Sequence, residues 1–243
     1  MKIAVSSGRE GSGKTLVSTN LAVMFAEMGR HVTYVDCDVE KSNKLLALHS
    51  DIMSVDHFIF EQCIKGRIMH GRSWAVDVHS GITESENEHA ASQLIAEMKK
   101  WSGKDITIFD SPSSIGFPLE ETLRDIDYCV LVVPVIDDTC DWLDGVINIC
   151  LSAGYRPGIV LNRNSFEAVS ILGLLEYHAL PVLGGIPYCD SRIERITSEG
   201  STVVDMLPEY RGIFRDIAEN ILIQINSQSE TSETAGRTFA GKS

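Results

Sequence analysis

Short apolar runs rich in β-branched residues alternate along the chain with longer segments of helical period. This alternation is typical of parallel strands joined by crossover helices. The runs that predict strands span residues 2–6, 31–36, 105–110, 128–133, 158–162 and 182–186. Four of these runs are almost wholly apolar in their middle positions, as strands covered on both faces must be. The pattern predicts an α/β fold, with a doubly wound, mostly parallel sheet flanked by helices.

Helical period is clearest at 14–28, where Leu21, Met24, Phe25 and Met28 recur at three- and four-residue spacing. The other segments that predict helices span 88–101, 141–153, 166–178 and 212–225. The weakest pattern covers 45–85, for which we predict short helices near 55–64 and a strand near 74–78.

The organisation of the chain is that of one domain over 1–226, with a variable region at 44–104. We see no internal repeat. The tail at 227–243 is rich in Ser, Thr, Glu and Gly with one aromatic residue. Such a composition buries too little apolar surface to offset the entropy of ordering, so we expect a disordered tail.

The net charge of −13 limits the kinds of partner that the protein is expected to bind. Nucleic-acid binding depends on Lys and Arg that neutralise phosphates, so nucleic acid is an unlikely partner. The six cysteines form no C-x-x-C pair, which favours reduced thiols over a zinc or iron–sulfur site. No apolar run is long enough for a transmembrane segment, and no signal peptide is evident, so we predict a cytoplasmic protein.

A phosphate-binding motif occupies residues 8–15, which read G-R-E-G-S-G-K-T between the first predicted strand and the first predicted helix. In that context backbone N–H groups can surround a β-phosphate, and the helix amino end adds partial positive charge. Lys14 would reach the β- and γ-phosphates, and the Thr15 hydroxyl would ligate Mg²⁺. We therefore predict ATP and Mg²⁺ as ligands. The predicted nucleotide contacts are Gly8, Glu10, Gly11, Ser12, Gly13, Lys14, Thr15 and Leu16.

Two predicted strands end in carboxylates. The strand at 31–36 leads into Asp36 and Asp38, and the strand at 105–110 ends at Asp110. Ligands of open α/β sheets bind at the carboxyl ends of strands, so these groups should face the phosphate loop. We predict Asp36 and Asp110 as metal-site residues beside Thr15, and Asp38 as the group that orients the attacking water. For one aspartate alone, a helix cap or turn residue would be the simpler interpretation.

The strand at 158–162 ends in Asn162 and Arg163, with no carboxylate of the kind that guanine requires. A side-chain amide such as that of Asn162 can pair with N6 and N7 of adenine. We therefore predict an adenine site that includes Asn162 and Arg163. The alternative is that Asn162 is only a strand-end turn residue.

Together these segments resemble the MinD/ParA/Mrp superfamily of ATPases with a deviant Walker A loop, over residues 2–43 and 105–208. The resemblance rests on the loop at 7–15, on Asp36-Cys37-Asp38-Val39-Glu40 with Asn43, on Asp110-Ser111-Pro112, on Asn162-Arg163 and on Ile186-Pro187-Tyr188. It implies a P-loop NTPase fold of the SIMIBI type, which dimerises face to face around two ATP molecules and separates after hydrolysis.

The resemblance also implies roles for single residues. It assigns phosphate binding to residues 11–15, magnesium to Thr15 and Asp110, water positioning to Asp38, and adenine contacts to Asn162 and the Pro187 backbone. Arg9 matches the family's signature lysine, which reaches the partner's phosphates, so we include Arg9 with Lys14 and Asp38 as catalytic candidates.

The chain departs from the family pattern at three positions. Arg9 replaces lysine, Glu10 brings a carboxylate near the phosphates, and Ser114 stands where a glycine is usual. These changes predict slow hydrolysis with nucleotide binding retained. Residues 44–104 contain one cysteine, Cys63, so the ferredoxin inserted in many MinD-like members is missing.

The sequence thus predicts a Mg-ATP-dependent dimerisation switch with weak ATPase activity. It would serve a protein cargo or effector in metallocofactor maturation or cellular positioning. The dimer could be a homodimer or a heterodimer with a paralogous ATPase. The alternative is a catalytically silent nucleotide-binding subunit that regulates such a paralogue. DNA transport is disfavoured by the charge.

Overall fold

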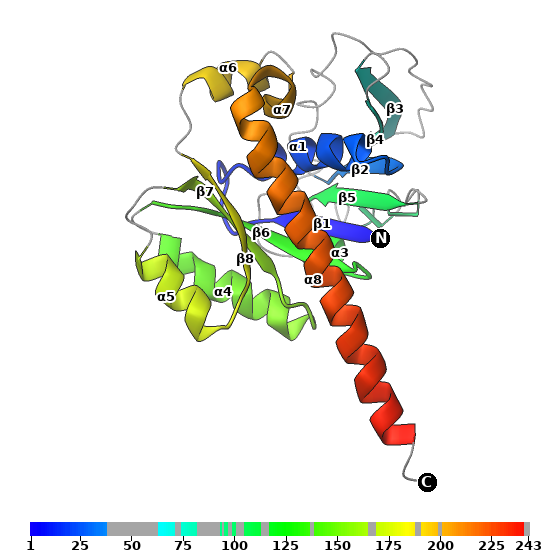
Figure 1. The fold of residues 1–243 in the computed structure, drawn as a ribbon, viewed down its shortest axis with the longest axis vertical. Helices are drawn as coiled ribbons and strands as arrows, with labels where there is room; N and C mark the ends of the chain where they lie inside the picture. Colours follow the sequence, from blue (N-terminus) through cyan, green and yellow to red (C-terminus); the bar gives the residue numbers. More distant parts are fainter. Residues whose placement is uncertain are drawn as a thin grey trace.

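The fold is built on a single eight-stranded sheet with the strand order β3-β4-β2-β5-β1-β6-β7-β8 (Figure 1). The computed structural model describes residues 1–37, 63–70, 74–81, 93, 95–96, 99–100, 105–112, 117–136, 139–164, 169–187, 191–198 and 201–240. The strands are β1 (Lys2–Ser6), β2 (Val32–Asp36), β3 (Cys63–His70), β4 (Trp74–Gly81), β5 (Ile106–Asp110), β6 (Tyr128–Pro134), β7 (Gly158–Asn164) and β8 (Val182–Pro187). The helices are α1 (Lys14–Glu27), α3 (Phe117–Leu123), α4 (Thr139–Ser152), α5 (Val169–Tyr177), α6 (Ser191–Ser198), α7 (Val203–Met206) and α8 (Pro208–Ala240).

Every strand pair of this sheet is parallel except the pair of β3 with β4. The prediction of a mostly parallel, doubly wound sheet is confirmed. β1 lies inside the sheet, between β5 and β6. The chain winds outward in opposite directions from β1, and this kind of switch point leaves a ligand crevice at the carboxyl ends of the strands.

Two apolar cores cover the two faces of the sheet. On one face α1, α6, α7 and α8 contribute to one buried cluster, and on the other face α3, α4 and α5 contribute to the second. Side chains of β1 alternate between them, with Ile3 and Val5 in the first cluster and Ala4 in the second. Because both faces are covered, β1 is buried and the loop that follows it rests on a fixed base.

The predicted strands of the sheet's interior agree with the structure to within a residue or two at each end. The suggested strand near 74–78 is confirmed as β4. The helix predicted near 55–64 is wrong at Cys63 and Ile64, which begin β3, while its earlier residues lie outside the described part of the chain. β3 forms because it pairs antiparallel with β4, and that pairing cannot be read from the mixed local pattern.

The last helix is longer than predicted. The sequence placed its end at 225 and expected disorder over 227–243, whereas α8 continues to Ala240. No proline interrupts the chain after Pro208, so the backbone hydrogen-bond series can continue through polar residues. Figure 1 shows the carboxyl-terminal part of α8 extending past the edge of the sheet.

Candidate nucleotide-binding site

The loop between β1 and α1 has the backbone shape that a phosphate site requires. Gly11 and Gly13 adopt left-handed conformations, with φ of 71° and 96°. Other residues rarely take these angles, so glycine at both positions has a conformational reason. The Gly13 carbonyl accepts the Val17 N–H at 2.9 Å, which starts the hydrogen bonding of α1. Gly13 offers no side chain to cap the helix, and the amino end of an α-helix is a place that favours anions.

Two side chains of the loop are buried although both are polar. Lys14 is 5% exposed and Ser12 is 1% exposed. The Ser12 hydroxyl has no hydrogen-bond partner among the described residues. An unsatisfied buried hydroxyl costs free energy, so it is expected where a ligand oxygen completes the site. The loop therefore fits the triphosphate that the sequence predicts.

Carboxylates at the ends of β2 and β5 lie side by side, and that of Asp110 contacts this loop. Asp36 and Asp110 are paired neighbours in the parallel register, and they are 5% and 2% exposed. The Thr15 hydroxyl donates to Asp110 Oδ2 at 2.7 Å, so two of the three predicted metal-site residues are in direct contact. The Tyr34 hydroxyl donates to the same oxygen at 2.8 Å.

These oxygens suit Mg²⁺, which prefers carboxylate, hydroxyl and water ligands and binds with few protein groups. Within the described residues, no cluster of three His, Cys, Asp or Glu side chains could hold a metal ion. A Mg²⁺ ion at Thr15 and Asp110 would thus depend on nucleotide oxygens and water for most of its ligands. The residues fit a metal that enters together with a nucleotide.

Burial and negative charge act together on the neighbouring groups. Burial, and then the carboxylates of Asp110 and Asp36, raise the pKa of the Tyr34 phenol well above its ordinary value. Burial, followed by the same two carboxylates, also raises the pKa of the Cys37 thiol. Tyr34 is therefore a neutral donor and Cys37 a neutral thiol near physiological pH, and neither can serve as an anionic nucleophile there.

Asn162 lies against the phosphate loop from the end of β7. Its Nδ2 donates to the Ser12 carbonyl at 2.7 Å, and its Oδ1 accepts the Arg163 N–H at 2.9 Å. Pro187 pairs with Asn164 at the end of the adjacent strand β8. The two predicted base-contact segments thus lie beside each other at the carboxyl edge, and Asn162 also holds the loop, a contact that the sequence did not predict.

The remaining predicted residues fall into three groups. Arg9 and Glu10 are exposed at the loop, where they could meet a ligand or a partner. Leu16 packs partly against the apolar core, so only its backbone is suited to phosphate. Asp38 and Ser114 lie outside the described residues.

Two aromatic residues near the site were missed by the sequence analysis. Tyr34 lies on β2, and its contact with Asp110 becomes visible only when β2 and β5 pair. Trp142 of α4 packs on Gly8, where an added Cβ would lie 2.6 Å from the indole ring. α4 therefore closes directly over the first residue of the loop.

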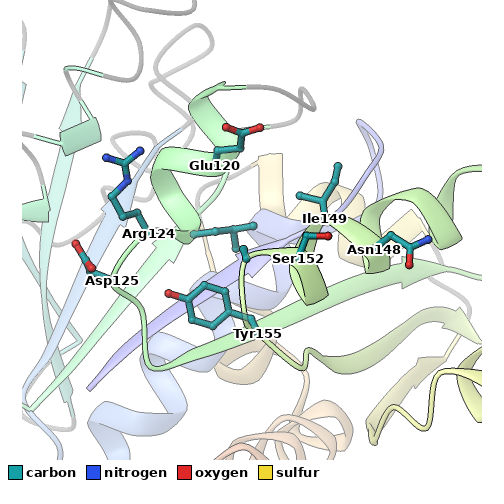
Figure 2. Close-up of a pocket in the computed structure, with 9 residues that line it drawn as sticks. Glu120, Arg124, Asp125, Asn148, Ile149, Ser152 and Tyr155 are labelled. Atoms are coloured by element: carbon teal, nitrogen blue, oxygen red, sulfur yellow. The ribbon is translucent and has the colours of Figure 1, made fainter.

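A separate groove of about 600 Å³ lies between the carboxyl ends of α3 and α4. Figure 2 shows its polar rim and the ring of Tyr155. It is lined by Glu120, Leu123, Arg124, Asp125, Asn148, Ile149, Ser152, Ala153 and Tyr155. These residues precede β6 and β7, so the groove lies at the amino edge of the sheet, opposite the phosphate loop. It plays no part in the nucleotide site.

A parallel α/β sheet with a phosphate loop after its central strand defines a P-loop nucleotide-binding protein. The family model described as the CobQ/CobB/MinD/ParA nucleotide binding domain matches residues 3–203. The chain belongs to this family, and the predicted membership of the MinD/ParA/Mrp superfamily is confirmed. Members of the family are nucleotide-binding ATPases.

Curated relatives share about a quarter of the sequence. An uncharacterised ATP-binding protein of Methanocaldococcus jannaschii is 28% identical over 217 residues, covering 85% of this chain and 81% of the relative. The septum site-determining protein MinD of Helicobacter pylori is 25% identical over 244 residues, covering 90% of each. An iron–sulfur cluster carrier protein of Pyrococcus abyssi is 26% identical over 233 residues, covering 87% of this chain and 71% of the relative.

Solved structures of similar proteins show the same architecture. The cell division ATPase MinD of Pyrococcus furiosus superposes with a TM-score of 0.72 at 25% identity, covering 92% of this chain and 98% of that one. MinD of Pyrococcus horikoshii, solved in complex with Mg-ADP, gives a TM-score of 0.71 at 26% identity, covering 90% of this chain and 95% of that one.

In the described part of the chain, none of the helices has both the length and the apolar character needed to span a membrane.

Proposed function

We propose that this protein binds Mg-ATP at the loop between β1 and α1, hydrolyses it slowly, and uses the bound nucleotide to control dimerisation. The observation that carries the proposal is the 2.7 Å contact between Thr15 of the loop and the buried Asp110. That contact joins the phosphate loop to a buried carboxylate, and these are two of the groups that would hold Mg²⁺ when a nucleotide is bound. The complex of a similar MinD with Mg-ADP supports the same pairing of ligands.

Each group of residues at the site would have its own chemical role. Backbone N–H groups of 11–15 and the Lys14 ammonium would bind the phosphates and offset their charge. Thr15 and Asp110 would hold Mg²⁺, which supplies charge stabilisation to the transferred phosphoryl group, and Asp36 would support them. Asp38 remains the predicted group for water positioning, and Arg9 the predicted cation for the partner's phosphates.

The adenine base would lie toward the ends of β7 and β8, at Asn162, Arg163 and Pro187. These elements lie next to each other in the sheet, and β7 comes within hydrogen-bond distance of the loop. The absence of a carboxylate from the segment Asn162-Arg163-Asn164-Ser165 supports adenine over guanine.

The output of the switch would be a protein cargo or effector. Relatives include a septum site-determining protein and an iron–sulfur cluster carrier, which supports cellular positioning or metallocofactor maturation as the setting. The dimer would form with a second copy or with a paralogous ATPase. The net charge of −13 supports a protein partner over nucleic acid.

The test is a calorimetric titration with Mg-ATP together with an assay of phosphate release. Lys14→Ala should weaken ATP binding by roughly 100-fold, because a buried cation on the phosphates is lost. Lys100→Ala removes an exposed lysine and is the matched control, with no expected change. Absence of ATP binding by the wild-type protein would overturn the proposal, as would equal binding by the Lys14→Ala variant.

A second candidate function is a nucleotide-binding subunit that does not hydrolyse ATP and regulates a paralogue. The exposed carboxylate of Glu10 beside the loop favours it, because it would repel phosphate charge as hydrolysis proceeds. Tight ATP binding without phosphate release above background would support this candidate. Turnover by the isolated protein, lost in Lys14→Ala, would exclude it.

A further inference from the structure

The Ser12 carbonyl of the phosphate loop accepts a hydrogen bond from the end of another strand, β7. Backbone N–H groups that converge on an anion leave their carbonyls pointing away from it, and a buried carbonyl needs a donor. Asn162, which is 3% exposed and 150 residues away in sequence, supplies that donor at 2.7 Å. The phosphate loop is therefore anchored to the end of β7 before any nucleotide binds.

The orientation of the Asn162 amide is determined by its two partners. The Ser12 carbonyl can only accept a hydrogen bond, and the Arg163 N–H can only donate one. Nδ2 must therefore face the loop and Oδ1 must face Arg163. The amide is held in one orientation.

Gly13 leaves the space that this contact needs. A Cβ added at Gly13 would lie 2.2 Å from Asn162 Nδ2, closer than real Cβ contacts occur. The close approach of side chain to backbone thus depends on glycine at this position, in addition to the φ of 96° that favours glycine.

The consequence follows from the planarity of the peptide bond. The Ser12 C=O and the Gly13 N–H belong to one trans peptide unit, so they point in opposite directions. When Asn162 holds the carbonyl on one side, the Gly13 N–H is directed to the other side, toward the ligand. We propose that Asn162 is a positioning residue of the phosphate loop, which aims the Gly13 N–H at the β-phosphate and couples the base-side strand β7 to the phosphate site.

This inference rests on the proposed Mg-ATP site and replaces the adenine contact proposed above for Asn162, because both polar atoms of its amide are already engaged. A nucleotide with a different base and the same phosphates distinguishes these two roles of Asn162. Hypoxanthine, the base of ITP, carries a carbonyl oxygen where adenine carries its N6 amine, so Mg-ITP lacks the N6 donor with which an adenine-reading amide would pair. A residue that acts through the loop affects Mg-ATP and Mg-ITP by the same factor.

The experiment measures Mg-ATP and Mg-ITP affinity for the wild-type protein and for Asn162→Ala, with weak binding read by competition against a labelled ATP. The expected result is a loss of about tenfold for both nucleotides, with the ATP-to-ITP affinity ratio unchanged. Asn162→Asp keeps the shape of the side chain and loses the donor, so the same unchanged ratio is expected if the alanine variant folds poorly.

Three results would overturn the inference. A loss confined to ATP would make Asn162 a base-reading residue. Unchanged affinities with a lower melting temperature would make it only a turn residue. Failure of the wild-type protein to bind either nucleotide would remove the proposed function and this inference with it. If the wild-type protein binds ATP and the Lys14→Ala variant does not, a failure at Asn162 leaves the proposed function intact.

Discussion

The two edges of the central sheet differ in how they place charged side chains. At the carboxyl edge Lys14, Asp36 and Asp110 are each at most 5% exposed. At the amino edge the side chain of Asp127 is 55% exposed and that of Arg124 is 67% exposed. Burying charge costs stability unless it is compensated, so a fold that needed only to be stable would have little reason for the first arrangement.

The amino edge shows what charges do when no ligand is involved. The Lys2 N–H donates to Asp127 Oδ2 at 2.7 Å, and the chain's amino terminus lies 3.9 Å from the same oxygen. Exposed ion pairs of this kind contribute little to stability because water and salt screen them. Buried carboxylates, more than the number of charges, therefore distinguish the functional edge, since the buried Lys99 ammonium donates to the Glu121 and Arg124 carbonyls near the amino edge.

Asp110→Asn should separate function from stability at the carboxyl edge. The variant keeps an acceptor for Thr15 and Tyr34 but removes the charge that would hold Mg²⁺. Mg-ATP affinity should fall by roughly 100-fold, while the free energy of unfolding stays equal or rises by about 1 kcal/mol because a buried charge is gone. Calorimetry and urea denaturation measure the two. A variant that unfolds easily and still binds Mg-ATP normally would contradict the contrast.

Glu27→Ala tests a buried carboxylate that lies away from the loop. Glu27 of α1 forms an ion pair with Arg211 of α8, and the Glu27 side chain is mostly buried. Its loss should lower the free energy of unfolding by about 1.5 kcal/mol, with nucleotide affinity unchanged. The control is Arg192→Ala, since Arg192 pairs with Glu209 at a half-exposed site and should change nothing. A large change in ATP affinity for Glu27→Ala would show that buried charge is coupled across the whole domain.

Tyr34→Phe removes the phenol that donates to Asp110, and the free energy of unfolding near pH 7 should fall by about 1 kcal/mol. Because folding raises the Tyr34 pKa, its contribution is complete below the unfolded-state value of 10.0 and is lost as the pH rises above that value. The wild-type protein should therefore lose stability above about pH 10, and the variant should lose less. Thermal melts from pH 7 to 11 measure both. An identical pH dependence would contradict the pKa direction.

Asp127→Asn is the amino-edge counterpart of Asp110→Asn. The neutral side chain can still accept the Lys2 N–H, and the lost ion pair is half-exposed. The free energy of unfolding should change by less than about 0.5 kcal/mol, and nucleotide affinity should not change. Urea denaturation beside the Asp110→Asn variant gives the comparison directly. A loss above 1 kcal/mol would show that the amino edge also depends on its charges.

Local sequence patterns predicted the strands whose own apolar runs are buried. They missed elements whose form depends on another segment of the chain. β1 and β6 were predicted because their apolar runs are covered on both faces. β3 was missed because its strand form comes from pairing with β4. The polar end of α8 was expected to be disordered, because composition alone does not show a helix that starts on the sheet and continues beyond it.

The parts of the site that are formed by contiguous residues were predicted. The contacts between residues far apart in the sequence were missed. The loop at 8–15 and the acidic strand ends are contiguous motifs, and parallel strands bring their carboxyl ends together as a rule of the fold. The Tyr34 hydroxyl on Asp110 and the Asn162 amide on Ser12 join residues separated by 76 and 150 positions. No spacing in the sequence could specify either contact.

The sequence by itself determined the fold class, the phosphate loop and the family, because backbone conformation, glycine placement and apolar periodicity are local properties. Only the tertiary structure decided which polar groups are buried together, since burial and hydrogen bonding depend on which strands and helices become neighbours. The direction in which the Gly13 N–H points is therefore a property of the packed sheet, because a side chain from β7 orients a peptide unit that follows β1.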